Sequence, residues 1–267
     1  MRTEQVSSTS NPKLKRLLAL QEKSSLRRDE GLFVVEGRRE TENLLEAGFV
    51  PETLFLCREL FPLPDFLLEK AAGANPDLLV VEVPKALYAK AAYRESTEGL
   101  IAEVRCRDLS LEDLHLSENP LIVVLEAVEK PGNLGAVLRS SDAAGADAVV
   151  ICDPLTDLYN PNLIRASLGA AFTVPCVACT SGEAIAWLKS RGIRILTAQL
   201  QDSSLYYDVQ MTSGTAIVMG AESTGLTDEW RRAADAHIRI PMLGTLDSLN
   251  VSVSAAILLF EAVRQRQ

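Results

Sequence analysis

Apolar residues in the first part of the chain recur in patterns that predict alternating strands and helices. Short apolar runs between glycines and polar turns are typical of strands, and apolar positions three or four residues apart are typical of helices. The predicted strands are 32–35, 53–57, 78–83 and 100–106, and the predicted helices are 10–30, 38–47, 65–72 and 84–93. This alternation predicts a small α/β domain.

A second alternating series follows a charged and polar stretch at 108–120, so we expect a domain boundary near residue 116. The two predicted domains are therefore 1–115 and 116–267. In the second, strands are predicted at 121–125, 148–152, 172–179, 193–197, 215–219 and 238–242, and helices at 133–144, 163–168, 183–189, 228–234 and 250–264. Because these strands are continuously apolar and separated by helices, they predict a parallel sheet covered on both faces.

Three polar, glycine-rich segments follow predicted strands of the second domain, at the end where ligands bind parallel sheets. They are 129–139 (EKPGNLGAVLR), 219–226 (MGAESTGL) and the turn 243–249 (LGTLDSL) with the helix start that follows it at Asn250. Glycine lets the backbone bend sharply or approach a ligand closely, and Ser248 and Asn250 lie where the first turn of a helix has unpaired N–H groups. Each segment alone is compatible with an ordinary turn or helix cap, whereas three at one sheet edge favour a binding site.

The composition describes a folded protein, since 47% of the 267 residues are hydrophobic and 24% are charged. No apolar run has the length of a membrane span, and the polar, basic amino terminus lacks an apolar signal core. We therefore expect a cytoplasmic protein that does not contact a membrane.

The net charge of −9 argues against a protein covered in positive charge for nucleic acid, although the charge is unevenly distributed. Residues 1–28 hold the basic side chains Arg2, Lys13, Lys15, Arg16, Lys23, Arg27 and Arg28, and only two acidic ones, Glu4 and Glu22. This segment is compatible with a local RNA contact and equally with a solvated helix face.

The residue types and motifs that many enzymes need are missing. Cys176 and Cys179 have the spacing of a metal-binding pair, but there is no second pair and only two histidines, His115 and His237. We therefore expect no metal site and buried thiols. GxGxxG after the first strand of either domain, GxxxxGK(S/T) and GxSxG are also absent, which disfavours the common dinucleotide, phosphate-loop and hydrolase sites. Acid–base chemistry would fall to Arg, Glu, Asp, Ser or Asn.

At the three glycine-rich segments the sequence resembles the SpoU family of RNA ribose 2′-O-methyltransferases, within the SPOUT group. The matching residues are Asn133-Leu-Gly135-Ala-Val-Leu-Arg139, Gly220-Ala-Glu222-Ser-Thr-Gly225-Leu, and Ile240-Pro-Met followed by Ser248-Leu-Asn250-Val-Ser-Val-Ser. Their order and spacing match the family over roughly residues 119–266. Residues 10–105, with Phe33-Val-Val-Glu-Gly37, resemble less closely the substrate-binding domain ahead of many such catalytic domains. Lys130 is a departure, because many members have Asn or Asp there.

This resemblance implies a parallel sheet threaded into a trefoil knot, an exception among folds, with S-adenosylmethionine bent inside the knot and held by backbone groups. By position, the expected cofactor contacts are Thr197, Ala198, Met219, Gly220, Ile240, Met242 and Leu249. The family works as homodimers that pack the first and last helices of the domain across the interface. The strongly apolar last helix of this chain agrees with that arrangement.

The resemblance assigns the catalytic roles to Arg139, Asn133, Glu222, Ser248 and Asn250. A sulfonium methyl group is already activated, so the protein has to orient the ribose hydroxyl in line and help remove its proton. Arg139 is the family's expected base, but a guanidinium has a pKa above ~12 and stays charged. Arg139 would therefore need help from another group such as an RNA phosphate, or would instead bind that phosphate and stabilise the alkoxide.

The function that the resemblance implies is methyl transfer from S-adenosylmethionine to a ribose 2′-hydroxyl of RNA. Ribosomal RNA is preferred over transfer RNA because of the additional amino-terminal domain, in which the expected RNA contacts are Lys13, Lys15, Arg16, Arg27 and Arg28. Two alternatives stay open, a transfer RNA methyltransferase and a non-catalytic RNA-binding or ribosome-assembly protein on the same fold. A small-molecule enzyme with another nucleotide is disfavoured by the missing phosphate-loop motifs.

Overall fold

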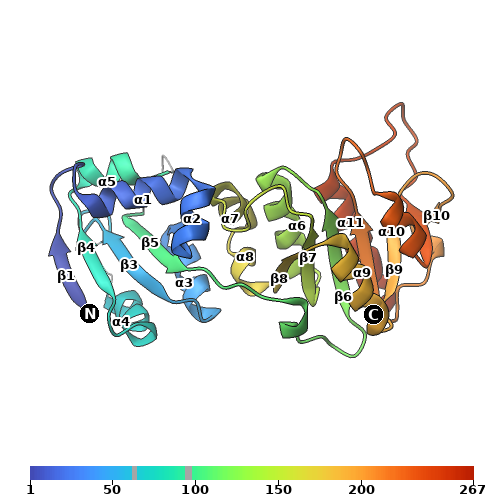
Figure 1. The fold of residues 1–267 in the computed structure, drawn as a ribbon, viewed down its shortest axis with the longest axis horizontal. Coiled ribbons are helices and arrows are strands. Elements are labelled where there is room, and N and C mark those ends of the chain that lie inside the picture. The colour runs from blue at the N-terminus through green and yellow to red at the C-terminus, as the bar shows by residue number, and fades with distance from the viewer. Residues whose placement is uncertain (62–64, 94–97) are drawn as a thin grey trace. The chain divides into compact units, whose positions relative to one another are not determined.

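The computed structural model of this chain describes residues 1–61, 65–93 and 98–267. These residues form two compact units (Figure 1): unit 1 contains Met1–Arg107 and Tyr159–Ile164, and unit 2 contains Asp108–Leu158 and Arg165–Gln267. Unit 2 begins before the expected boundary near residue 116, because Leu109, Leu111 and Leu114 pack against its hydrophobic core. Among the described helices, none has both the length and the apolar character needed to cross a membrane.

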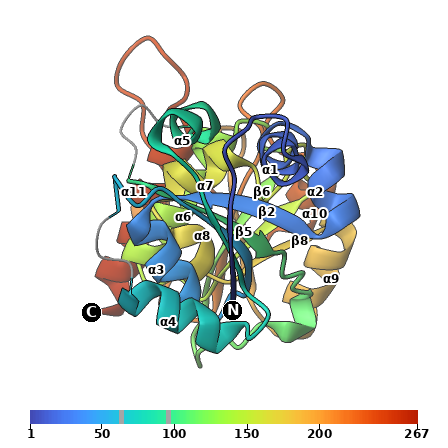
Figure 2. The same ribbon diagram turned by 90° about the vertical axis from the view of Figure 1, so that its left-hand side faces the viewer.

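Within the described residues, unit 1 is a mixed five-stranded sheet with helices on both faces. Its strands lie in the order β1-β4-β3-β5-β2, with β5 antiparallel to β3 and β2 and the other pairs parallel. Helices α1 and α5 cover one face, and α3 and α4 cover the other (Figures 1 and 2). The elements are β1 (Arg2–Gln5), α1 (Pro12–Glu22), α2 (Ser24–Glu30), β2 (Leu32–Glu36), α3 (Arg38–Glu46), β3 (Pro51–Leu56), α4 (Asp65–Ala74), β4 (Leu79–Glu82), α5 (Lys85–Ala91) and β5 (Leu100–Arg105).

Strand β1 is the element of unit 1 that the hydrophobic pattern does not predict. Its residues are polar and exposed, so they carry no apolar signal. It holds the edge of the sheet through parallel backbone pairing with β4, from Arg2 opposite Leu79 to Gln5 opposite Glu82.

The single helix expected at 10–30 is in fact two helices, and the side chain of a buried arginine lies at the break between them. Asn11 caps α1 by accepting a hydrogen bond from the Lys13 amide at 2.9 Å, and the helix ends at Glu22. Arg27, only 2% exposed, donates from Nη1 to the carbonyl oxygens of Leu20 (2.5 Å) and Gln21 (3.2 Å). The guanidinium thus pairs carbonyls at the end of α1 that have no helical partner. The expectation that Arg27 lies on an exposed RNA-binding face was wrong.

Arg16, like Arg27, has a structural role, because it pairs with the carboxylate of Glu103 in the sheet of unit 1. Glu103 on β5 is completely buried and accepts hydrogen bonds from the Arg16 guanidinium, one of them from Nε at 3.4 Å. Burial raises the pKa of the Glu103 carboxyl above its ordinary value, and the bond from Arg16 opposes that shift. Removal of Arg16 would leave a buried carboxylate without its cation, at a cost on the order of 2–3 kcal/mol.

Within the described residues, unit 2 is a seven-stranded sheet in which every pair is parallel, so the expected parallel sheet is confirmed. Helices α6 and α11 lie on one face, and α9 and α10 lie on the other (Figure 1). From residue 108 on, the elements are the short 3₁₀ helices η1 (Leu111–Asp113) and η2 (Tyr206–Asp208), the strands β6 (Leu121–Glu126), β7 (Ala148–Cys152), β8 (Cys176–Cys179), β9 (Arg194–Ala198), β10 (Ser204–Leu205), β11 (Thr215–Met219) and β12 (Ala236–Arg239), and the helices α6 (Pro131–Ala143), α7 (Pro161–Ser167), α8 (Ala170–Thr173), α9 (Ser181–Ser190), α10 (Asp228–Ala233) and α11 (Val251–Arg266).

The predicted strand at 172–179 is the clearest error in unit 2. Its first residues belong to α8, which begins after Gly169, a glycine with a positive φ of 98°. The strand itself starts only after Pro175, which has no N–H group to donate to a neighbouring strand. An apolar run of this kind does not by itself distinguish a buried helical turn from a strand.

The order of the strands places three connecting loops next to one another. The sheet order is β10-β12-β9-β11-β6-β7-β8. From β6 the chain first builds β7 and β8 toward one edge, and then returns to the other side of β6 to form β9. β11 lies between β6 and β9, and β12 lies beyond β9. Because parallel strands end at the same edge, the segments after β9, β11 and β12 meet there.

Candidate active site

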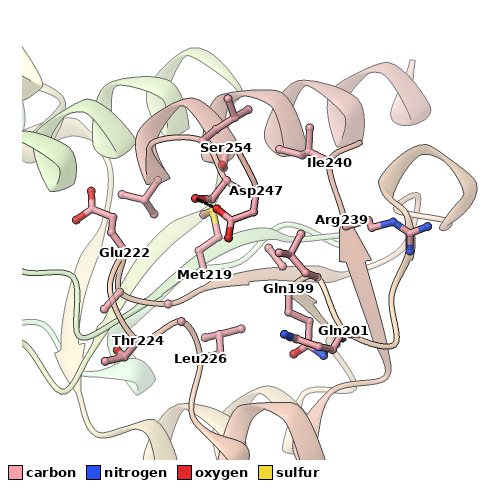
Figure 3. Close-up of a pocket in the computed structure, with 18 of the residues that line it drawn as sticks. Gln199, Gln201, Met219, Glu222, Thr224, Leu226, Arg239, Ile240, Asp247 and Ser254 are labelled. Atoms are coloured by element: carbon pink, nitrogen blue, oxygen red, sulfur yellow. Dashed lines mark hydrogen bonds between the residues drawn. The ribbon is translucent and has the colours of Figure 1, made fainter. Parts of the chain in front are cut away.

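A pocket of about 430 Å³ lies where these three segments meet. That volume falls in the range of small-molecule sites, roughly 300–1,000 Å³. Its lining side chains come from the ends of β9, β11 and β12 and from α11 (Figure 3). Of the residues expected to contact the cofactor, six line this pocket: Ala198, Met219, Gly220, Ile240, Met242 and Leu249.

Thr197, the seventh of those residues, does not line the pocket. It is fully buried in β9, and its Oγ1 lies 2.6 Å from Nδ1 of His237 on the neighbouring strand β12. The two residues are paired in the sheet register, so their side chains lie on the same face. The side chain of Thr197 therefore ties β9 to β12, and its expected contact with the cofactor stays a prediction.

The loop after β11 depends on two glycines. A Cβ atom at Gly220 would lie 2.3 Å from the carbonyl carbon and oxygen of Gly225, so no other side chain fits unless the backbone moves. Gly225 itself has a φ of +67°, and its amide donates to the Ala221 carbonyl at 2.8 Å. The loop is therefore folded tightly against itself, and its other side faces the pocket.

The far end of the same loop is fixed by a buried carboxylate, Glu126, whose role the sequence did not indicate. Glu126 ends β6 and accepts hydrogen bonds from the amide and the hydroxyl of Thr227, at 2.8 and 2.7 Å. Ser181 at the start of α9 also donates to it, at 3.4 Å, and receives a bond from the Trp230 indole. In the sequence Glu126 reads simply as the first polar residue after an apolar strand, which is why its function was missed.

Three of the five expected catalytic residues form one hydrogen-bonded cluster. Nδ2 of Asn133, at the start of α6, donates to Oε1 of Glu222, and Nδ2 of Asn250 donates to Oδ1 of Asn133 at 3.2 Å. The Lys130 ammonium lies 3.7 Å from Oε2 of Glu222. Asn250 also caps α11, because its Oδ1 accepts from the Ser252 amide at 3.0 Å. The three glycine-rich segments are thus joined by side chains.

Arg139 and Ser248 are not part of this cluster. Ser248 is exposed, and its hydroxyl donates to Asp247 at 3.1 Å. Arg139 lies six residues after Asn133 on α6, roughly 120° around the helix from it, and its side chain is exposed. With the residues that the structure describes, it makes no hydrogen bond or ion pair. Its guanidinium is therefore available to an anionic ligand.

The basic residues expected to bind RNA have different surroundings in unit 1. Arg27 and Arg16 are used within the fold as described above, and Lys13 forms an ion pair with Glu4. Lys15 and Arg28 are exposed and have no ion pair among the described residues. The exposed positive charge of this face is smaller than the sequence suggested.

The chemistry of the pocket fits S-adenosylmethionine. Its walls combine polar side chains with the apolar Ala198, Met219, Leu226 and Ile238, and the apolar part suits a purine ring and a thioether chain. The side-chain oxygen of Gln199 is buried without a hydrogen-bond partner among the described residues, which suits a ligand with N–H or O–H donors. By contrast, no three His, Cys, Asp or Glu side chains in the described parts of the chain are grouped so as to hold a metal ion.

Comparisons with known proteins agree with this site. A family model described as the SpoU rRNA Methylase family matches residues 120–260, and one described as an MRM3-like substrate binding domain matches residues 11–102. The 23S rRNA (guanosine-2′-O-)-methyltransferase RlmB of Photobacterium profundum is 41% identical over 64% of this chain and 73% of its own length. The 23S rRNA (uridine(2479)-2′-O)-methyltransferase of Streptomyces viridochromogenes is 32% identical over 88% of this chain and 84% of its own.

A solved structure extends the likeness to nearly the whole chain. The AdoMet-bound rRNA methyltransferase from Sinorhizobium meliloti superposes with a TM-score of 0.91, at 29% identity, over 98% of each chain. The matches therefore include both the pocket-bearing unit and the amino-terminal one. With its parallel sheet, its three converging segments and the family match over more than half its length, this chain belongs to the SpoU rRNA methylase family.

Proposed function

We propose that this chain transfers a methyl group from S-adenosylmethionine to a ribose 2′-hydroxyl of ribosomal RNA, in the cytoplasm. The observation that carries the proposal is the joining of Asn133, Glu222 and Asn250 beside a pocket of cofactor size. Two relatives that match most of their length are named as 23S rRNA 2′-O-methyltransferases, which favours ribosomal over transfer RNA. One modifies guanosine and the other uridine by name, so the target base differs within the family.

The pocket residues hold the cofactor, which supplies an activated methyl group when bound. Ala198, Gly220 and Ile240 bring three strand ends close enough for backbone groups to reach it, and Met219, Met242 and Leu249 give apolar contact. The tightness of the Gly220–Gly225 loop keeps these groups in place before the cofactor arrives. Preorganisation of this kind lowers the entropic cost of binding.

The Asn133–Glu222–Asn250 cluster positions the substrate side of the reaction. Asn133 uses both ends of its side-chain amide within the cluster, Asn250 uses its nitrogen, and Glu222 is held by Asn133 and Lys130. Arg139, exposed and uncommitted, binds the RNA phosphate beside the target ribose and stabilises the alkoxide as the hydroxyl loses its proton. This role suits a guanidinium better than that of a general base, since its charge persists at all working pH values.

We infer that the working form is a homodimer and that the segments after β11 and β12 are threaded as a trefoil knot. Support for the dimer comes from apolar side chains that α11 leaves in solvent, Val253 at 47% and Phe260 at 49% exposure. A second copy packed on α6 and α11 would cover them. Support for the knot comes from the strand order, in which β11 is placed between strands formed earlier in the chain.

The first prediction concerns Arg139. Replacing it by alanine should lower the rate of methyl transfer to ribosomal RNA by about 10²–10³-fold, because the alkoxide and its phosphate lose their cation. The measurement is incorporation of radiolabelled methyl groups into ribosomal RNA, with mapping of 2′-O-methyl positions. Arg232→Ala removes another exposed guanidinium of unit 2 and should leave the rate unchanged. Undiminished transfer by Arg139→Ala would reject its role, and a wild-type protein that binds no cofactor would favour the non-catalytic alternative.

A second prediction concerns the basic face of unit 1. Changing Lys15 and Arg28 together to glutamine should make the slope of log K for RNA binding against log salt concentration shallower. The expected change in slope is about 0.7–0.9 for each phosphate contact that is lost. Filter binding at several salt concentrations measures this slope. Lys189→Gln, an exposed lysine of α9, serves as control. An unchanged slope in the double variant would show that RNA does not bind at this face.

A third prediction concerns the loop after β11. Gly220→Ala should weaken binding of S-adenosylhomocysteine by about tenfold or more, because its Cβ has to displace the backbone at Gly225. Gly244→Ala is the matched change, since a Cβ there meets nothing within 4 Å and the residue does not line the pocket. Calorimetry distinguishes the two, and equal affinities would mean that this loop does not shape the cofactor site.

A further inference from the structure

Gln199, the first residue after β9, has a side-chain amide with only one of its two ends paired. Its Nε2 donates to the Gln201 carbonyl at 2.9 Å, while its Oε1 is fully covered and has no hydrogen-bond partner among the described residues. The residue lines the pocket (Figure 3). Neither the hydrophobic pattern nor the glycine-rich segments single it out.

The hydrogen bond to Gln201 determines which end of the Gln199 side-chain amide has no partner in the part of the chain that the structure describes. Turning the amide over would bring its oxygen against the carbonyl oxygen of Gln201, two acceptors without a hydrogen between them. The backbone N–H of Gln199 donates to the Ile238 carbonyl at 3.0 Å, so the main chain that carries this side chain is held by the sheet. The oxygen is therefore a preset acceptor, and a buried acceptor without a donor is unfavourable.

We propose that Oε1 of Gln199 accepts a hydrogen bond from the nucleoside half of S-adenosylmethionine, from its exocyclic amine or a ribose hydroxyl. This inference rests on the proposed function, because it assumes that the pocket takes this cofactor. It makes Gln199 a binding residue that selects for a donor at that position, since an analogue without the donor leaves the buried oxygen unpaired.

The apolar residues near Gln199 favour the nucleoside half of the cofactor. The backbone N–H of Gln199 donates to the Ile238 carbonyl, so the two residues are neighbours, and both line the pocket together with Leu226. The apolar side chains of Ile238 and Leu226 suit a purine ring.

Calorimetry with two probes tests this assignment. S-adenosylhomocysteine carries both halves of the cofactor, and 5′-methylthioadenosine carries only the nucleoside half. Gln199→Met keeps the size of the side chain and removes the acceptor, so both probes should bind about tenfold more weakly than to the wild-type protein. Gln210→Met, an exposed glutamine outside the pocket, should bind both as the wild type does.

The outcomes separate this inference from the proposed function. Equal affinities of wild type and Gln199→Met for both probes would overturn the inference, as would a loss seen with S-adenosylhomocysteine alone, which would assign the oxygen to the ammonium. A wild-type protein that binds neither probe would instead overturn the proposed function. Should the variant not fold, wild-type crystals with S-adenosylhomocysteine decide, because a nucleoside donor should lie within about 3.2 Å of Oε1.

Discussion

The order of the strands in unit 2 determines which distant parts of the chain can meet. β11 lies between β6 and β9, and β12 lies on the other side of β9, so three consecutive positions of the sheet end in segments from different parts of the sequence. All pairs are parallel, and these ends therefore share one edge. The pocket and the Asn133–Glu222–Asn250 cluster both follow from this arrangement. A sheet with its strands in sequence order would separate the same residues.

Local constraints then turn the shared edge into a defined site. Gly220 and Gly225 let the loop after β11 fold against itself, and the buried Glu126 holds its far end through Thr227. Asn250 has two functions at once, since it caps α11 with its oxygen and donates to Asn133 with its nitrogen. The site is thus built from groups whose positions are fixed by the backbone and by hydrogen bonds, and groups fixed in this way can orient a substrate.

Much of this organisation could be predicted from the sequence, because the strands of unit 2 are continuous apolar runs and its glycine-rich segments keep a family's spacing. The errors have physical causes. β1 is polar and is held only by backbone pairing, and the run at 172–179 contains a helical turn that hydrophobicity does not distinguish from a strand. Arg27 looked like an exposed charge because a sequence does not show that a helix ends at Glu22 and needs its carbonyls paired. Gln199 and Glu126 were missed for a similar reason, since their importance lies in burial.

Hydrogen–deuterium exchange with and without S-adenosylhomocysteine tests most directly whether the segments after β9, β11 and β12 form one cofactor site. If they do, the ligand should slow exchange in 199–203, 220–226 and 240–250 together, because one molecule contacts all three. Exchange in β4 and α5 of unit 1 should stay the same. Protection of only one of these segments, or protection confined to unit 1, would contradict the convergence on which the proposed function depends.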